Sequence, residues 1–216
     1  MSARPRAILF DWDNTLVDTW PALHESINAA LEAFGQVPWT FDETRKRVRK
    51  SMRDSFPDLF GANWEEAGEV FYQHFAAIHL EKLEARPGAE GMLRQLKAAG
   101  IYLGIVSNKN GDYLRREAAH LGWDSYFGQI VGAFDAKRDK PASDPVDLAL
   151  QGSGIAPGGE VWLAGDDKID LECAVNAGCV PILVRETGPE AGEFDGHPPH
   201  RHFHKCQELS NLVEKL

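Results

Sequence analysis

The sequence predicts an α/β protein with a doubly wound parallel sheet that carries an inserted all-α segment. From residue 86 onward, short apolar runs of strand length alternate with helical patterns, which is typical of parallel strands joined by crossover helices. Residues 18–85 show only helical patterns, and a helical stretch inside an α/β pattern indicates a separate domain. We therefore expect an α/β core at 1–17 and 86–216, and a helical domain at 18–85.

Length and composition fit this organisation and argue against several other classes of protein. The 216 residues, 43% of them hydrophobic, suffice for one α/β domain with a small insertion. A net charge of −10 disfavours nonspecific binding to nucleic acid or to an anionic membrane. We see no apolar stretch of membrane-spanning length and no secretory signal. The three cysteines lack CxxC spacing, which favours reduced thiols and a cytoplasmic location.

The N-terminal part is expected to contain one strand and three helices. The strand covers about residues 6–11. The first helix starts after Thr19 as its N-cap and stops at Gly35. The second starts near Thr40, which has capping-box spacing to Glu43, and its apolar side extends to Phe56. The third covers about residues 63–83.

The remaining chain supplies the other strands and helices of the core. Strands are expected at 101–107, 129–131, 161–164 and 180–184, and helices at 89–99, 112–121, 168–177 and from Asp144 onward, where Pro145 suits a first helical position. Residues 186–206 are rich in Gly, Pro and His, and we interpret them as a polar loop rather than a metal site. Residues 207–216 are expected to form a last helix that packs back on the core.

Two aspartates at the end of the first strand suggest chemistry. Asp11 and Asp13 lie on the same side of an extended backbone, and their charges would repel in a dry site unless a divalent cation such as Mg²⁺ bound there. Alone, this pair equally fits a strand that ends in a turn. Other predicted strand ends carry Ser107 with Asn108, Lys140 before a proline, and Asp166 with Asp170 close behind. The carboxyl ends of strands are where such sheets bind ligands.

These motifs, in this order, resemble the four motifs of the haloacid dehalogenase superfamily, and the chain resembles its phosphoglycolate phosphatase-like members over about residues 6–185. The resemblance implies a phosphatase with a helical C1-type cap, here residues 18–85. It assigns Asp11 as the nucleophile that forms an aspartyl-phosphate, and Asp13 as the acid and base. Lys140 neutralises charge between Asp11 and the phosphate. Asn14 replaces the usual glycine, and asparagine tolerates the positive φ of that turn.

The resemblance also implies binding roles for the remaining motif residues. Ser107 and the Asn108 backbone N–H hold phosphoryl oxygens, and Thr15 supports the phosphate or caps its turn. Asp11, the Asp13 carbonyl, Asp166 and Asp170 surround Mg²⁺, with Asp170 acting through water or by orienting Lys140. We interpret Asp167 as a helix N-cap. In the cap, six of the residues 45–53 are basic, and Arg49 and Arg53 are candidates to bind an anionic group of the substrate.

The favoured function is an Mg²⁺-dependent phosphatase of a small phosphorylated metabolite, such as a phosphoglycolate-like acid or a sugar phosphate. A phosphomutase would use the same motifs but would have to exclude water. A phosphonate hydrolase would need a cap lysine of lowered pKa, for which Lys46 and Lys50 are poor candidates because their surroundings are basic. A non-catalytic phospho-ligand-binding protein would be expected to lack the acids that this chain retains.

Overall fold

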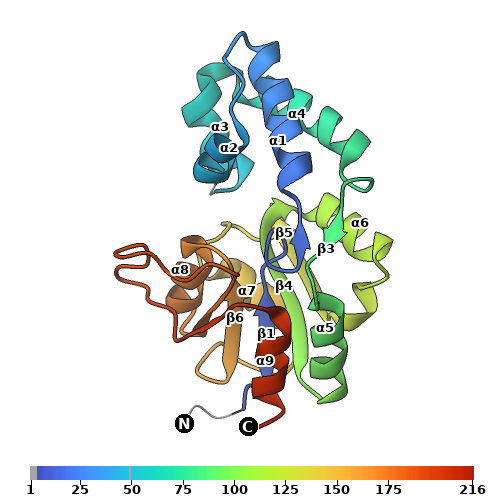
Figure 1. Cartoon of the computed structure of the whole chain (residues 1–216), viewed down its shortest axis with the longest axis vertical. Coiled ribbons are helices and arrows are strands. Elements are labelled where there is room, and N and C mark those ends of the chain that lie inside the picture. Colours follow the sequence, from blue (N-terminus) through green and yellow to red (C-terminus); the bar gives the residue numbers. More distant parts are fainter. Residues whose placement is uncertain (1–3, 49) are drawn as a thin grey trace. The chain divides into compact units, whose positions relative to one another are not determined.

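The computed structural model describes residues 4–48 and 50–216. The chain divides into two compact units, Met1–Val17 with Ala85–Leu216, and Asp18–Glu84. Figure 1 shows the first unit as an α/β structure and the second as a group of helices. The short strands β2 (Val17–Asp18) and β3 (Glu84–Ala85) pair where the chain passes from one unit to the other and back.

A parallel sheet with the strand order β5-β4-β1-β6-β7-β8 forms the centre of the α/β unit. Its strands are β1 (Ala7–Phe10), β4 (Tyr102–Asn110), β5 (Gln129–Ala133), β6 (Val161–Gly165), β7 (Val180–Val184) and β8 (Arg201–Phe203). The predicted doubly wound parallel fold is confirmed. The central strand β1 is fully buried, as its unbroken apolar run predicts for a parallel strand covered on both faces.

Helices cover both faces of this sheet. They are α5 (Ala89–Ala98), α6 (Gly111–His120), α7 (Asp144–Leu150), α8 (Lys168–Asn176) and α9 (Cys206–Val213), with a 3₁₀ turn η2 (Asp124–Tyr126). Ala7 and Leu9 of β1 pack into one apolar cluster with residues of α7 and α8, so these two helices share a face. Helices α5 and α9 lie side by side (Figure 1), as expected for a last helix that packs back on the core.

The strand register brings the motif residues to one edge. Phe10 pairs with Ile105 on one side and with Ala164 on the other. The residues that follow these positions, Asp11, Ser107 and Asp166, therefore emerge at the same carboxyl edge of the sheet. The Asp11 N–H extends the ladder by donating to the carbonyl of Ala164 at 2.8 Å.

One part of the predicted C-terminal loop is wrong. Arg201–Phe203 form β8, a short strand that pairs with Ile182–Val184 of β7. Three residues are too few to show the apolar periodicity that predicts a strand. Their pairing partner β7 also lies some twenty residues earlier in the sequence. His202 and His204 each hydrogen-bond a backbone carbonyl, of Arg185 and Glu186 respectively.

The second unit consists of the helices α1 (Trp20–Ala33), α2 (Phe41–Arg47), α3 (Met52–Phe60) and α4 (Trp64–Ile78) with the 3₁₀ turn η1 (Gly61–Asn63). Its core contains Ile27 and Leu31 of α1, Phe56 and Phe60 of α3, and Ala67 of α4. The predicted capping box is confirmed: Thr40 accepts from the Glu43 N–H, and Glu43 accepts from the Thr40 N–H.

Two helix boundaries in this unit differ from the prediction. The expected single helix from Thr40 to Phe56 is two helices, because Val48 has an extended backbone and Ser51 starts α3 as its N-cap. The last helix ends at Ile78, about five residues before the predicted end. Within the residues that the structure describes, no helix combines the length and apolar character needed to cross a bilayer.

Candidate active site

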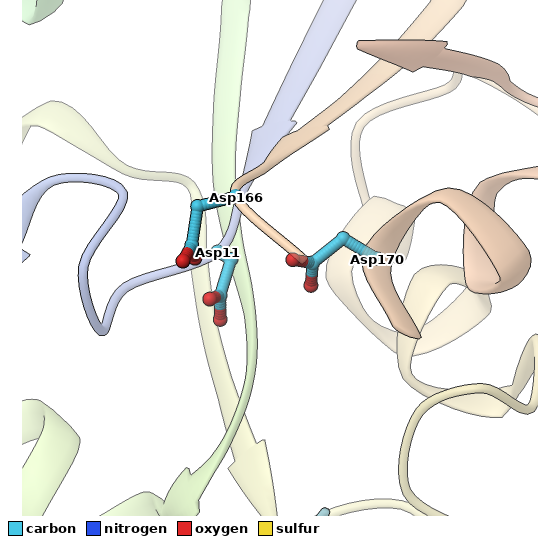
Figure 2. A group of neighbouring side chains, drawn as sticks. All are labelled: Asp11, Asp166 and Asp170. Carbon is cyan, nitrogen blue, oxygen red and sulfur yellow. The ribbon is translucent and has the colours of Figure 1, made fainter. Parts of the chain in front are cut away.

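Three carboxylates meet at the carboxyl edge of the sheet (Figure 2). Asp11 follows β1, Asp166 follows β6, and Asp170 lies in the first turn of α8. Each of them offers an oxygen within 4.8 Å of the others. Asp11 and Asp170 are buried, 7% and 1% exposed. Several acids this close in a buried place favour either protonation or a bound cation.

The pKa shifts of these acids reflect that crowding. Burial raises the pKa of Asp11 to about 7; Lys140 opposes this rise, and the charges of Asp170 and Asp13 add to it. Burial, with the charges of Asp170, Asp11 and Asp167, also holds the pKa of Asp166 well above its ordinary value. Oxygen ligands and excess negative charge suit a hard divalent cation, so this group of residues can hold a metal ion.

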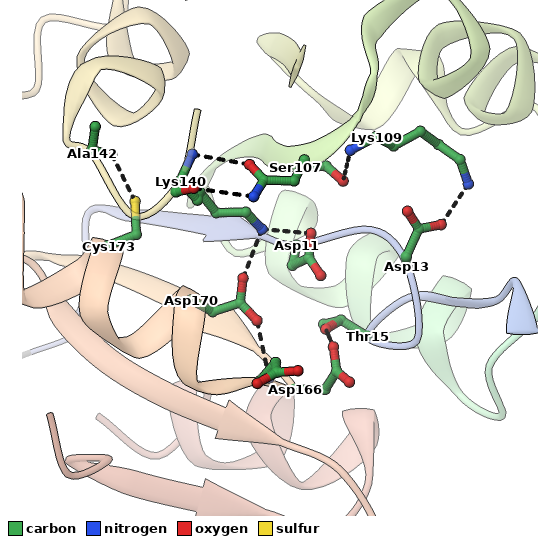
Figure 3. Close-up of polar contacts among 12 residues, drawn as sticks. Asp11, Asp13, Thr15, Ser107, Lys109, Lys140, Ala142, Asp166, Asp170 and Cys173 are labelled. Carbon is green, nitrogen blue, oxygen red and sulfur yellow. Dashed lines mark hydrogen bonds and ion pairs between the residues drawn. The ribbon is translucent and has the colours of Figure 1, made fainter. Parts of the chain in front are cut away.

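Lys140 links two of the acids (Figure 3). Its Nζ donates to Asp11 Oδ1 and to Asp170 Oδ1, both at 2.7 Å, and the lysine is 2% exposed. Burial lowers the pKa of Lys140, but the two carboxylates raise it more, so that it stays above its ordinary value. Lys140 is therefore a fixed positive charge beside Asp11. Asp170 contacts Lys140 directly, one of the two arrangements considered from the sequence.

The loop that carries Lys140 is fixed by the side chain of Asn108. The Asn108 amide accepts from the Lys140 N–H at 2.9 Å and donates to the Lys140 carbonyl at 3.1 Å. The Lys140–Pro141 peptide bond is cis. The sequence pointed to the backbone of Asn108, and the structure adds a role for its side chain as a clamp between β4 and this loop.

Thr15 and Ser107 also lie at this edge. The Thr15 hydroxyl donates to Asp166 Oδ1 at 3.1 Å. This hydrogen bond orients one of the three carboxylates that could bind a metal ion. Ser107 is buried, and its Oγ accepts the Lys109 N–H at 3.2 Å, so its own hydroxyl proton stays available to donate. Asn14 has φ +63°, and the turn between Asp13 and Thr15 takes the positive φ expected from the sequence.

The start of α8 follows the sequence-based interpretation. Asp167 caps the helix, with its side chain accepting backbone N–H groups, and Asp170 accepts the Asp167 N–H at 3.1 Å. Gly165 allows this approach, since a Cβ there would lie 2.2 Å from Asp170 Cγ. The predicted N-cap role of Asp167 is confirmed.

Asp13 has partners that the sequence reasoning missed. Lys109 Nζ donates to Asp13 Oδ1 at 2.5 Å and to Glu117 Oε2 at 2.8 Å. Glu117, fully buried in α6, also accepts the Trp12 Nε1–H at 2.7 Å. Burial lowers the pKa of Lys109, but the charges of Asp13 and Glu117 raise it more. A signal was present: Glu117 occupies a position on the apolar side of its helix, next to buried Leu114 and Ala118.

The structure says less about the proposed role of the basic residues 45–53 of the helical unit in substrate binding. Arg49 lies outside the described residues, and Arg53 lies half-buried in α3. Arg45 and Arg47 have their guanidinium groups over the rings of Trp20 and Trp39, at 5.5 and 4.9 Å. Such contacts are cation–π interactions, so part of the positive charge packs on aromatic rings of its own unit.

Comparisons with known proteins agree with this fold and site. The family model described as haloacid dehalogenase-like hydrolase matches residues 8–184. A phosphoglycolate phosphatase from Xylella fastidiosa is 32% identical over 89% of this chain and 85% of its own. A Clostridium perfringens protein provisionally named pyrophosphatase PpaX is 25% identical over 98% of both chains. The crystal structure of a protein from Bacteroides fragilis, provisionally described as a haloacid dehalogenase-like hydrolase, has a TM-score of 0.86 and 26% identity, covering 95% of this chain and 99% of its own.

The chain belongs to the haloacid dehalogenase-like hydrolase family. Its relatives place it among the phosphatases of that family, and the prediction of a phosphatase enzyme is confirmed.

Proposed function

We propose that this protein is an Mg²⁺-dependent phosphomonoesterase of a small phosphorylated metabolite, acting through an aspartyl-phosphate on Asp11. The observation that carries the proposal is the place of Asp11. Its Oδ1 is held by the ammonium of Lys140 at 2.7 Å, and Asp166 and Asp170 each offer an oxygen within 4.8 Å. A carboxylate held beside a fixed cation and a candidate metal site is suited to attack an anionic phosphorus centre.

In the proposed first step, an oxygen of Asp11 attacks the phosphorus, and the bond between phosphorus and the ester oxygen breaks. Asp13 gives its proton to the leaving oxygen, so an alcohol departs and an aspartyl-phosphate remains. In the second step, Asp13 takes a proton from the water that attacks the same phosphorus. Inorganic phosphate leaves, and Asp11 and Asp13 return to their starting states. General acid–base help of this kind is worth about 10²–10⁴ in rate.

The other residues of the site are proposed to bind and orient the phosphoryl group. Lys140 neutralises charge between Asp11 and that group, and Ser107 with the Asn108 backbone N–H donates to its oxygens. Asp11, the Asp13 carbonyl and Asp166 would hold Mg²⁺, with Asp170 close by and Thr15 fixing Asp166. When bound, Mg²⁺ would supply positive charge that offsets the acids and the phosphoryl oxygens.

The substrate class rests on the relatives. Because several of them are named phosphoglycolate phosphatases, we propose a small phosphate ester that carries a second anionic group. The helical unit would act as the cap that selects it, with Arg49 and Arg53 binding the second anion. The separation of that unit from the α/β unit supports a domain of its own.

The proposal is tested first with p-nitrophenyl phosphate. We expect phosphate release that requires Mg²⁺, that is lost in Asp11→Asn, and that persists in Asp124→Asn, an exposed aspartate of the same unit. Full activity of a folded Asp11→Asn protein would contradict the nucleophile assignment.

Substrate choice is then measured as kcat/KM over 2-phosphoglycolate, sugar phosphates and inorganic pyrophosphate. A preference for 2-phosphoglycolate that Arg53→Ala reduces through KM would support the proposed anion site. Glucose 1-phosphate converted into glucose 6-phosphate without phosphate release would instead indicate a mutase.

A further inference from the structure

We propose that Lys109 and Glu117 are positioning residues for Asp13, and that they hold this carboxylate where it can exchange a proton with the leaving group. The inference deepens the proposed function and rests on it. It concerns a hydrogen-bonded group of four residues, Trp12, Asp13, Lys109 and Glu117, which we call the Asp13 clamp.

The clamp is anchored at its buried end. Glu117 is 0% exposed in α6, and its Oε2 accepts both the Trp12 indole N–H at 2.7 Å and the Lys109 ammonium at 2.8 Å. A buried carboxylate destabilises a fold unless its partners satisfy it. Glu117 therefore fixes the place of Lys109, whose side chain is 4% exposed.

The free end of the clamp is Asp13. Lys109 Nζ contacts Asp13 Oδ1 at 2.5 Å, and the Asp13 side chain is 20% exposed, five times the fraction of its lysine. The ammonium contacts Oδ1 of this carboxylate, and we assign Oδ2 to carry the transferred proton while Oδ1 stays held. Figure 3 shows Lys109 reaching from β4 to Asp13.

The Asp13 clamp also contacts the backbone segment between Asp11 and Asp13, through Trp12. Trp12 stands between Asp11 and Asp13 in the sequence, is fully buried, and meets Trp123 edge-to-face at 5.9 Å. Its indole N–H and the Lys109 ammonium end on the same oxygen of Glu117. The backbone between the two aspartates is thus tied to α6 from one side, and the Asp13 carboxylate from the other. Fixed placement of this kind is what general acid catalysis requires.

The test compares two substrates that differ in their need for an acid. The p-nitrophenolate group leaves without a proton, whereas an alkoxide from a simple alkyl phosphate requires one. Because kcat/KM reports the steps up to the first bond cleavage, loss of Asp13 placement lowers it more for the alkyl phosphate. For Glu117→Gln we expect the ratio of alkyl to aryl kcat/KM to fall about tenfold, part of the 10²–10⁴ that an acid contributes.

Three further variants separate positioning from a general loss of structure. Trp12→Phe removes the indole N–H together with part of the buried ring, and should lower the ratio in the same direction. Tyr102→Phe, which removes the hydrogen bond from Tyr102 to the Ala149 carbonyl, is the matched control and should leave the ratio unchanged. In an Asp13→Asn background, Glu117→Gln should cause no further fall in the ratio, because coupled residues are not additive.

Equal losses for both substrates, or an additional fall in the Asp13→Asn background, would overturn the inference while leaving the proposed function intact. Wild-type protein that releases no phosphate from either substrate would overturn the proposed function itself. If Glu117→Gln does not fold, the ratio of alkyl to aryl kcat/KM in Trp12→Phe tests the inference by the same criterion.

Discussion

Asp11 and Asp13 each have a lysine, and the surroundings of these lysines differ. Lys140 bridges Asp11 to Asp170 at the start of α8, and Lys109 bridges Asp13 to Glu117 in α6. Around Lys140 a third acid, Asp166, leaves negative charge in excess. Beside Lys109, Glu117 also accepts the neutral indole N–H of Trp12. In the proposed mechanism, Lys140 therefore serves the site for a cation and phosphate, whereas Lys109 holds a single carboxylate in place.

The largest effect is expected from removing the first lysine. Lys140→Met leaves Asp11 and Asp170 buried without their cation, and breaking a buried pair costs about 3–5 kcal/mol of stability. Loss of a fixed charge near the reacting group should lower kcat/KM by about 10²–10³. Urea unfolding and phosphate release measure the two effects. Lys137→Met, an exposed lysine of the same loop, is the control and should change neither.

The second lysine should matter less for an easy substrate. Lys109→Met leaves the contact between Lys140 and Asp11 in place, and p-nitrophenolate leaves without a proton. Hydrolysis of p-nitrophenyl phosphate should therefore fall by at most about tenfold, through the role of Asp13 as the base for water, well below the loss in Lys140→Met. Steady-state kinetics of the two variants under the same conditions gives the comparison. Equal losses would mean that the two lysines do not serve separate carboxylates.

The stability gained on metal binding should depend on the three-acid group around Lys140 and not on the residues around Lys109. Mg²⁺ at about 100 times its Kd stabilises a folded protein by about 2.7 kcal/mol, and EDTA should remove that gain in thermal unfolding. Asp166→Asn should abolish it, and Glu117→Gln should retain it, because Glu117 lies outside the three-acid group. Loss of the gain in Glu117→Gln would break the proposed separation.

The same measurement has a pH dependence with a definite sign. Burial raises the pKa of Asp11 from 3.8 to about 7, so between these values the folded protein binds a proton that the unfolded chain has lost. The contribution of Asp11 to stability of the metal-free protein therefore falls as pH rises from about 4 to 7. Mg²⁺ competes with that proton, and its stabilising effect should be larger at pH 7.5 than at pH 5. Melting temperatures with Mg²⁺ or EDTA at both pH values check this; an equal gain at both would contradict it.

The last effect, on packing beside Asp170, is expected at Gly165. In Gly165→Ala the new Cβ would lie 2.2 Å from Asp170 Cγ, so Asp170 must move, at about 1–3 kcal/mol for overpacking. Its contact with Lys140 should weaken, and activity should fall with stability. Gly159→Ala, where a Cβ meets nothing within 4 Å, is the control measured alongside it by thermal unfolding.

Local patterns predicted the sheet, and the family resemblance pointed to Lys140. The run Ala7–Phe10 is apolar without interruption, and parallel strands buried on both faces read in this way. Once β1, β4 and β6 are neighbours, a shared edge follows for Asp11, Ser107 and Asp166. The cap of α8 by Asp167 is likewise a local signal, spanning three residues.

Interactions between distant residues account for what the sequence did not reveal. Lys109 and Asp13 are 96 positions apart, and their contact depends on how β4 and α6 pack beside β1. The break before Met52 is similar, because the apolar positions of residues 41–56 fit one long helix, and the extended backbone at Val48 overrides that periodicity. The strand β8 exists through its pairing with β7, which three residues alone do not encode.

The amide of Asn108 imitates a peptide group toward Lys140, giving and receiving one hydrogen bond with the same residue. An ionised aspartate could only accept, and a serine is too short to serve both atoms. In this protein the geometry of the loop therefore depends on the side chain at position 108. The side chain at this position is therefore a marker of how the lysine loop is built, and carries no information on the identity of the substrate.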